Sequence, residues 1–139
     1  MRGFSLLEVL VVFAIFGVLV GFSSISFLHS SDKYRLQKAV WEIHSNLNYA
    51  RFKAIFNGTK SRMSFDRCGY TIERLDLETG EWKVEAAIIL EGVVIQSNND
   101  PVFHPQGTVS NLASIIVTNS WGAYKITLAI SGRIKIVKI

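Results

Sequence analysis

An almost unbroken run of apolar side chains occupies the N-terminal part of the chain, from Phe4 to Leu28. Glu8 is the only charged residue in this run. As a helix, the run would be about 37 Å long at about 1.5 Å per residue, which is enough to cross a hydrocarbon core of about 30 Å. A carboxylate within such a segment costs roughly 2.5 kcal/mol or more in lipid, so Glu8 indicates a function beyond anchoring.

Apolar residues then recur with helical spacing over residues 29–57. Ser30, Ser31 and Asp32 form a polar step, which either caps a new helix or marks the end of the membrane segment. Beyond it, one apolar stripe is formed by Leu36, Val40, Ile43, Leu47, Ala50 and Ala54. Gly58 follows Asn57 as a stop signal. The pattern predicts one long helix over residues 4–57, whose second half packs on a globular domain.

Short segments with alternating apolar and polar residues follow the predicted helix and indicate β-strands. They cover residues 60–66, 69–75, 82–90, 93–97, 114–118, 124–129 and 133–139. A helix followed by strands predicts an α+β fold, in which the helix packs on an antiparallel β-sheet domain formed by residues 58–139.

The last two predicted strands allow their register to be derived. A three-residue loop ending at Gly132 pairs Leu128 with Ile134 and Ile126 with Ile136, which keeps the apolar side chains on one face. Such loops place glycine at the last, left-handed position.

The opposite face of this hairpin is predicted to be basic. The register groups Lys125, Thr127, Arg133 and Lys135 there. A cluster of cations is the feature that would contact the phosphates of DNA, whereas scattered charge would serve only solubility.

Composition adds few constraints. The chain has 139 residues and a net charge of +4, which leaves about 110 residues for one soluble domain after the apolar segment. Cys68 is the only cysteine, and the three histidines have no ligand-like spacing, so neither a disulfide nor a metal site is expected. The sequence has no recognisable nucleophile motif or phosphate-binding loop. We therefore expect no enzymatic activity and no cofactor.

The stretch from Gly3 to Glu8, Gly-Phe-Ser-Leu-Leu-Glu, closely resembles the class III signal of type IV pilins and of the pseudopilins of type II secretion. The resemblance implies that residues 1–3 are a leader and that prepilin peptidase cuts between Gly3 and Phe4. It also implies that the new amino group of Phe4 is methylated. Residues 4–28 would then form a helix that serves as membrane anchor and filament core.

The new amino group gives Glu8 a physical role. Phe4 and Glu8 are i and i+4 neighbours, and axial stacking of subunits would bring the amine of one chain to the carboxylate of another. This pairing relieves the buried charge only in the assembled state, so it favours entry into a filament in register. The expected partners are other pilin or pseudopilin subunits, the inner-membrane assembly platform and inner-membrane lipid.

Two later motifs extend the resemblance over nearly the whole chain. The segment from Phe103 to Gly107 is similar to the F-x-P-x-G element of GspH/FimT-type minor pseudopilins and minor pilins. Gly132-Arg133 is similar to their terminal G-R element. Major pseudopilins carry an acidic calcium loop near the C-terminus, but no Asp or Glu follows Asp100 here, so we expect no calcium site.

Two functions remain in competition. The favoured one is a minor pseudopilin at or near the pseudopilus tip of a type II secretion system, anchored in the bacterial inner membrane with its C-terminal domain in the periplasm. The alternative is a FimT-like minor pilin that binds DNA during uptake through a G-R-x-R tail. Lys135 replaces the final arginine of that tail, and the tail has no aromatic residue for base stacking. A third reading is an ordinary anchored periplasmic domain, for which Met1 would stay in the mature protein.

Overall fold

A single helix, α1 (Leu6–Asn57), runs through the N-terminal part of the chain in a computed structural model that describes residues 5–139, without the side chains of residues 21–30. It begins after the extended residue Ser5. The helix continues without a break through the polar step at residues 30–32. It ends where the sequence predicts, because Gly58 takes a left-handed conformation with φ of 63°.

All seven predicted strand segments form strands. They are β1 (Ser61–Asp66), β2 (Gly69–Leu75), β3 (Trp82–Ile89), β4 (Val94–Ser97), β7 (Ser114–Asn119), β8 (Gly122–Leu128) and β9 (Ile134–Lys138). Two strands of two residues each, β5 (Val102–Phe103) and β6 (Val109–Ser110), were not predicted, because an alternating pattern needs more residues than they contain.

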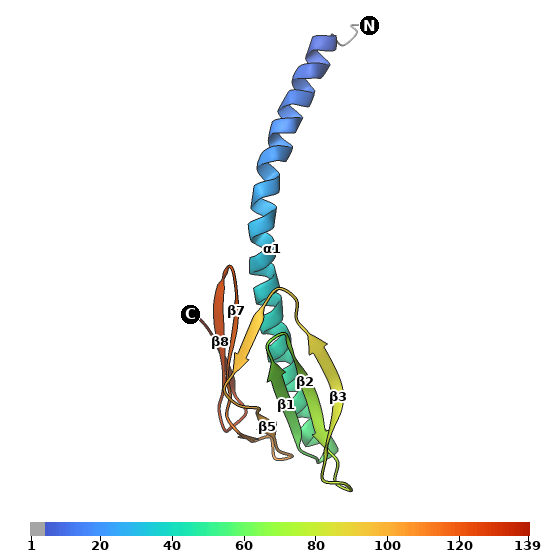
Figure 1. The fold of residues 1–139 in the computed structure, drawn as a ribbon, viewed down its shortest axis with the longest axis vertical. Coiled ribbons are helices and arrows are strands. Elements are labelled where there is room, and N and C mark those ends of the chain that lie inside the picture. The colour runs from blue at the N-terminus through green and yellow to red at the C-terminus, as the bar shows by residue number, and fades with distance from the viewer. Residues whose placement is uncertain (1–4) are drawn as a thin grey trace.

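The strands form two antiparallel sheets. One has the order β3-β2-β1-β5-β6, and the other has the order β4-β7-β8-β9. Figure 1 shows both sheets lying beside the second half of α1, whose first half extends well beyond them. The predicted α+β fold, a long N-terminal helix packed on antiparallel β-structure, is confirmed.

The hydrophobic core lies between the helix and the two sheets. The whole predicted helical stripe from Leu36 to Ala54 is buried there, and it meets Met63, Ile72, Phe103, Ile115, Val117 and Ile126. Full burial of a leucine or isoleucine side chain contributes about 1.5–3 kcal/mol. The packing of this stripe therefore explains why the second half of α1 is fixed to the sheets.

The hairpin of β8 and β9 has the predicted register. Leu128 lies opposite Ile134, and Ile126 lies opposite Ile136. Gly132 closes the loop with φ of 80°. The prediction is confirmed because only this loop length keeps the apolar side chains of both strands on the core side.

Candidate assembly surfaces

Glu8 lies in the first turn of α1 and is exposed. A carboxylate at this end of a helix is stabilised by the helix dipole, because the backbone N–H groups of the first turn point towards it. Gly3 and Phe4, the predicted cleavage and methylation residues, lie outside the described residues. The structure therefore locates the Glu8 carboxylate at the start of α1. Its pairing with the amino group of Phe4 stays a prediction.

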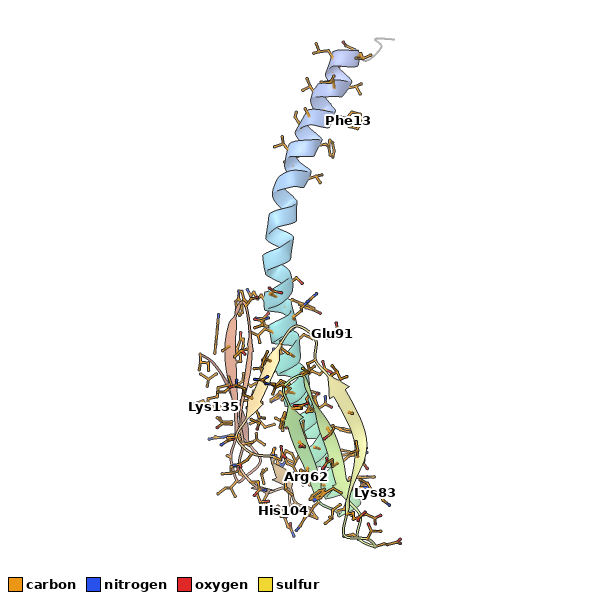
Figure 2. The ribbon with its side chains drawn as sticks, in the orientation of Figure 1. Phe13, Arg62, Lys83, Glu91, His104 and Lys135 are labelled. Carbon is orange, nitrogen blue, oxygen red and sulfur yellow. The ribbon has the colours of Figure 1, made fainter. Side chains whose placement is uncertain are left out.

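The first half of α1 exposes large apolar side chains on all sides. Figure 2 shows them projecting around the helix, with Phe13 labelled. Their exposed fractions run from 44% to 83% for Leu6, Leu7, Val9, Leu10, Val11, Val12, Phe13, Ile15, Phe16, Val18, Leu19 and Val20. An exposed apolar surface of this extent indicates contact with lipid or with protein.

The predicted membrane span covers residues 4–28. Phe4 and the side chains of residues 21–28 lie outside the part of the chain that the structure describes. Within the described part of the chain, no helix is long and apolar enough to cross a membrane.

The second half of α1 carries a second apolar face, which the sequence analysis missed. Tyr34, Trp41, Phe52 and Phe56 are 68%, 63%, 60% and 77% exposed. At 3.6 residues per turn they share one side of the helix, roughly opposite the buried stripe. The rings of Phe52 and Phe56 stack with their centroids 5.7 Å apart. We call these four residues the aromatic stripe.

Arg51 joins the two later motifs to the helix. Its Nε donates to the carbonyl oxygen of Gly107 (2.9 Å), and its Nη2 donates to the carbonyl oxygen of Ser131 (3.1 Å). Its Nη1 lies 3.5 Å from the carbonyl oxygen of Gly132. The F-x-P-x-G and G-R elements, which are separated along the chain, therefore meet at one guanidinium group. We call this contact the Arg51 junction.

Two glycines allow the Arg51 junction to close. Gly107 and Gly132 have φ of 82° and 80°, a conformation that other residues rarely adopt. A Cβ atom on Gly132 would lie 2.6 Å from Nε of Arg51 and 2.9 Å from the carbonyl oxygen of Gly107. The glycines of both motifs therefore have a structural explanation in the packing of the β-domain on α1.

The predicted basic patch lies on the outer face of β8 and β9. Lys135 is opposite Thr127, and Lys125 is opposite Val137. Arg133 lies in the loop before β9, and both it and Lys135 are exposed. Among the described residues, no ion pair involves any of these three cations. The structure therefore brings the predicted basic residues to one face and leaves them open to an anion.

Tyr70 is the strongly shifted titratable group of the domain. Burial raises its pKa to about 12, although a hydrogen bond from Nδ2 of Asn46 to its hydroxyl (2.7 Å) acts in the opposite direction. A neutral phenol that bonds α1 to β2 is a structural group. The described residues also contain no group of three His, Cys, Asp or Glu side chains that could hold a metal ion.

Comparison with known proteins agrees with both halves of this description. Residues 1–24 match the family model of the prokaryotic N-terminal methylation motif. The fold is similar to that of the minor pseudopilin EpsH from the type 2 secretion system of Vibrio cholerae, with a TM-score of 0.64 and 13% identity over 75% of this chain and 97% of that chain.

A second solved structure with a similar fold is the type IV minor pilin FimU of Pseudomonas aeruginosa. Its TM-score is 0.58, with 18% identity over 76% of this chain and 90% of that chain. The chain therefore combines an N-terminal methylation motif with a fold similar to that of minor pilins and pseudopilins. No sequence among curated proteins matches this chain. The resemblance predicted from Gly3 to Glu8 and from the two later motifs is confirmed by the motif match and by the fold.

Proposed function

We propose that this pilin-like chain is a minor pseudopilin of a type II secretion system, at or near the pseudopilus tip. In this proposal prepilin peptidase removes residues 1–3, and the amino group of Phe4 is methylated. The inner membrane holds the first half of α1 until the assembly platform transfers the subunit to the filament. The observation that carries the proposal is α1 itself, whose exposed apolar surface in the first half lies within the residues that match the methylation motif.

The two halves of the helix support assembly in different ways. The first half offers apolar side chains all round and one carboxylate, Glu8, which is suited to a bundle of like helices with a cation placed beside it. The second half turns its buried stripe to the sheets and leaves the aromatic stripe uncovered. Aromatic side chains at an exposed face are typical of protein contacts. Both halves therefore have a surface for neighbouring subunits.

Processing at Gly3 tests the proposal. Gly3→Leu is expected to leave the full-length precursor, because the peptidase must accommodate the residue before the cut. Intact mass should show the wild-type chain shortened by residues 1–3 and carrying one methyl group. Gly17→Leu is the matched control, because a Cβ atom at Gly17 meets no atom within 4 Å, and it should be processed normally. Retention of Met1 in the mature wild-type chain would contradict the proposal and favour an ordinary anchored domain.

DNA uptake is the second candidate, and the shared outer face of Lys125, Arg133 and Lys135 favours it. A minor pilin with this role should bind double-stranded DNA with an affinity that falls steeply with salt. Replacing Arg133 and Lys135 by alanine should weaken that binding. The slope of log K against log salt should then correspond to about two fewer counterions released. Absence of DNA binding at low salt would leave the pseudopilin as the remaining candidate.

A further inference from the structure

The end of the β-domain nearest the first half of α1 carries a cluster of cations around one tryptophan. This end is formed by the β7–β8 turn and the β3–β4 turn, and both lie beside the middle of the helix (Figure 1). The cluster consists of Lys33 on α1, Trp121 in the β7–β8 turn, and Lys138 in β9. We call these three residues the helix-side rim.

The β7–β8 turn is fixed to the helix at Asp32. The side-chain amide of Asn119 donates to the backbone carbonyl of Asp32 (2.8 Å), and the hydroxyl of Ser120 donates to its carboxylate (2.6 Å). Trp121 is partly buried against the core. The tryptophan is therefore held at a defined height along α1, level with Asp32.

No ion pair within the described part of the chain joins a cation of the rim to a carboxylate. Nζ of Lys138 lies 3.8 Å from the ring centroid of Trp121, and Nζ of Lys33 lies 5.5 Å from it. Among the described residues, neither lysine takes part in an ion pair, and the nearby Asp32 carboxylate already accepts from Ser120. Two ammonium groups at one ring repel each other, so an anion placed between them would be stabilised.

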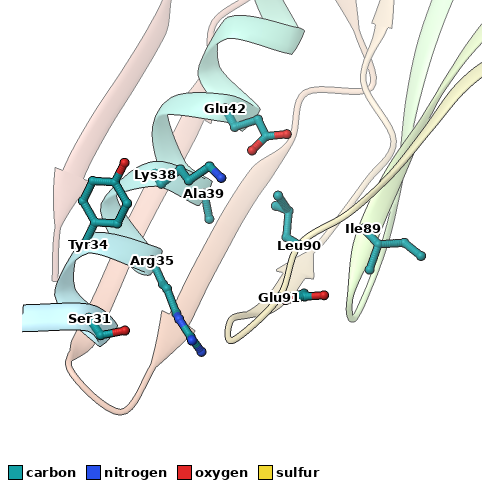
Figure 3. Close-up of a pocket in the computed structure, with 9 residues that line it drawn as sticks. All are labelled: Ser31, Tyr34, Arg35, Lys38, Ala39, Glu42, Ile89, Leu90 and Glu91. Carbon is teal, nitrogen blue, oxygen red and sulfur yellow. The ribbon is translucent and has the colours of Figure 1, made fainter. Parts of the chain in front are cut away.

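A groove on the β3–β4 side of α1 carries side chains of both charges. It has a volume of about 440 Å³ and lies between α1 and the β3–β4 turn. Figure 3 shows Arg35 and Lys38 on the helix side of the groove and Glu91 on the turn. Gly92 of the turn packs closely on Arg35, because a Cβ atom there would come within 3.1 Å of its Cδ. The groove holds two cations, Arg35 and Lys38, and two carboxylates, Glu42 and Glu91, so it adds no net charge to the rim.

The position of the rim matches the headgroup layer of a membrane. Asp32 follows the last residue of the apolar run, Leu28, by about 6 Å at about 1.5 Å per residue. The polar layer on each side of a bilayer is about 5–7 Å thick, and tryptophan and lysine side chains are enriched at this depth.

We propose that the helix-side rim binds the anionic headgroups of the membrane that holds the first half of α1. The phosphates would lie near Lys33 and Lys138, with the indole of Trp121 at the same depth. The inference rests on the proposed membrane anchor. It adds that the β-domain is seated on the lipid surface before assembly, so the subunit must release these headgroups when it enters a filament.

The test uses the full chain in nanodiscs, with Trp41→Phe and Trp82→Phe so that Trp121 is the only tryptophan and can be excited selectively. One set contains phosphatidylcholine alone, and the other also contains phosphatidylglycerol. We expect quenching by aqueous iodide to be roughly halved in the anionic set. Quenching by a nitroxide attached near the lipid headgroup should rise in the same set. Lys33→Glu with Lys138→Glu should abolish both differences.

Lys60→Glu with Lys83→Glu is the matched control, because it makes the same change in charge at exposed positions away from the rim and should keep both differences. Equal iodide quenching of the parent protein in the two lipids, with the protein retained in the discs, would overturn the headgroup contact and leave the anchor standing. Failure of the chain to associate with discs would overturn both the contact and the anchor.

Discussion

Glu8→Ala is expected to remove the subunit from filaments while leaving membrane insertion and removal of residues 1–3 intact. The substitution makes insertion cheaper, because no carboxylate then enters the lipid. In the filament, however, the amino group of Phe4 from a neighbouring chain would lose its partner. Breaking a buried charge pair from one side costs about 3–5 kcal/mol, so incorporation should fall by about 100-fold or more.

Immunoblots of sheared filaments and of membranes measure this effect. Glu78→Ala is the matched control, because it removes a carboxylate that is exposed in the turn between β2 and β3, and it should enter filaments as the wild type does. Normal incorporation of Glu8→Ala would show that the carboxylate does not register subunits.

Gly132→Ala is expected to lower the free energy of unfolding of the β-domain by about 2 kcal/mol or more. A left-handed backbone costs a residue with a Cβ atom about 1–2 kcal/mol. The new methyl group would also displace Nε of Arg51, so a hydrogen bond to Gly107 would be lost at a further cost of about 1 kcal/mol.

Urea unfolding followed by tryptophan fluorescence measures this change, on a fragment beginning at Ser31, because the buried core begins at Leu36. Gly122→Ala is the control. A Cβ atom at Gly122 meets no atom within 4 Å and its φ is not positive, so its effect should stay within about 0.5 kcal/mol. An equal decrease in the free energy of unfolding for the two variants would refute the explanation given for the Arg51 junction.

The parts of the fold that follow from short-range pattern were predictable from the sequence. The buried stripe from Leu36 to Ala54 repeats at helical spacing, and Gly58 ends the helix through its own conformational freedom. The β8–β9 register follows from alternation, since a shift by one residue would turn Ile126 towards solvent.

The long-range contacts were not predictable in this way. From the sequence alone, Arg51 is expected to be a solvated cation on a helix. Its contacts with Gly107 and Gly132 form only in the folded chain. The same holds for Trp121, which meets Lys33 and Lys138 from distant parts of the chain.

The aromatic stripe was present in the sequence but was overlooked. Tyr34, Trp41, Phe52 and Phe56 are separated by 7, 11 and 4 residues, which keeps them on one side of a helix. A helix with one apolar face is expected to have polar residues on the opposite side. Because this helix has one clear apolar stripe, its opposite side was assigned to solvent. An exposed face with this composition is the sequence signal of a helix that binds neighbours on two sides.

Cross-linking from the aromatic stripe inside filaments tests the central claim, that α1 builds this chain into a filament, most directly. A photoreactive phenylalanine analogue at Trp41 should join the subunit covalently to a neighbouring pilin-like subunit, and Glu8→Ala should abolish the adduct. The same analogue at Glu78, away from the helix, sets the background. The account is contradicted if position 41 gives no more adduct than position 78, or if the subunit is recovered only as a monomer in the membrane.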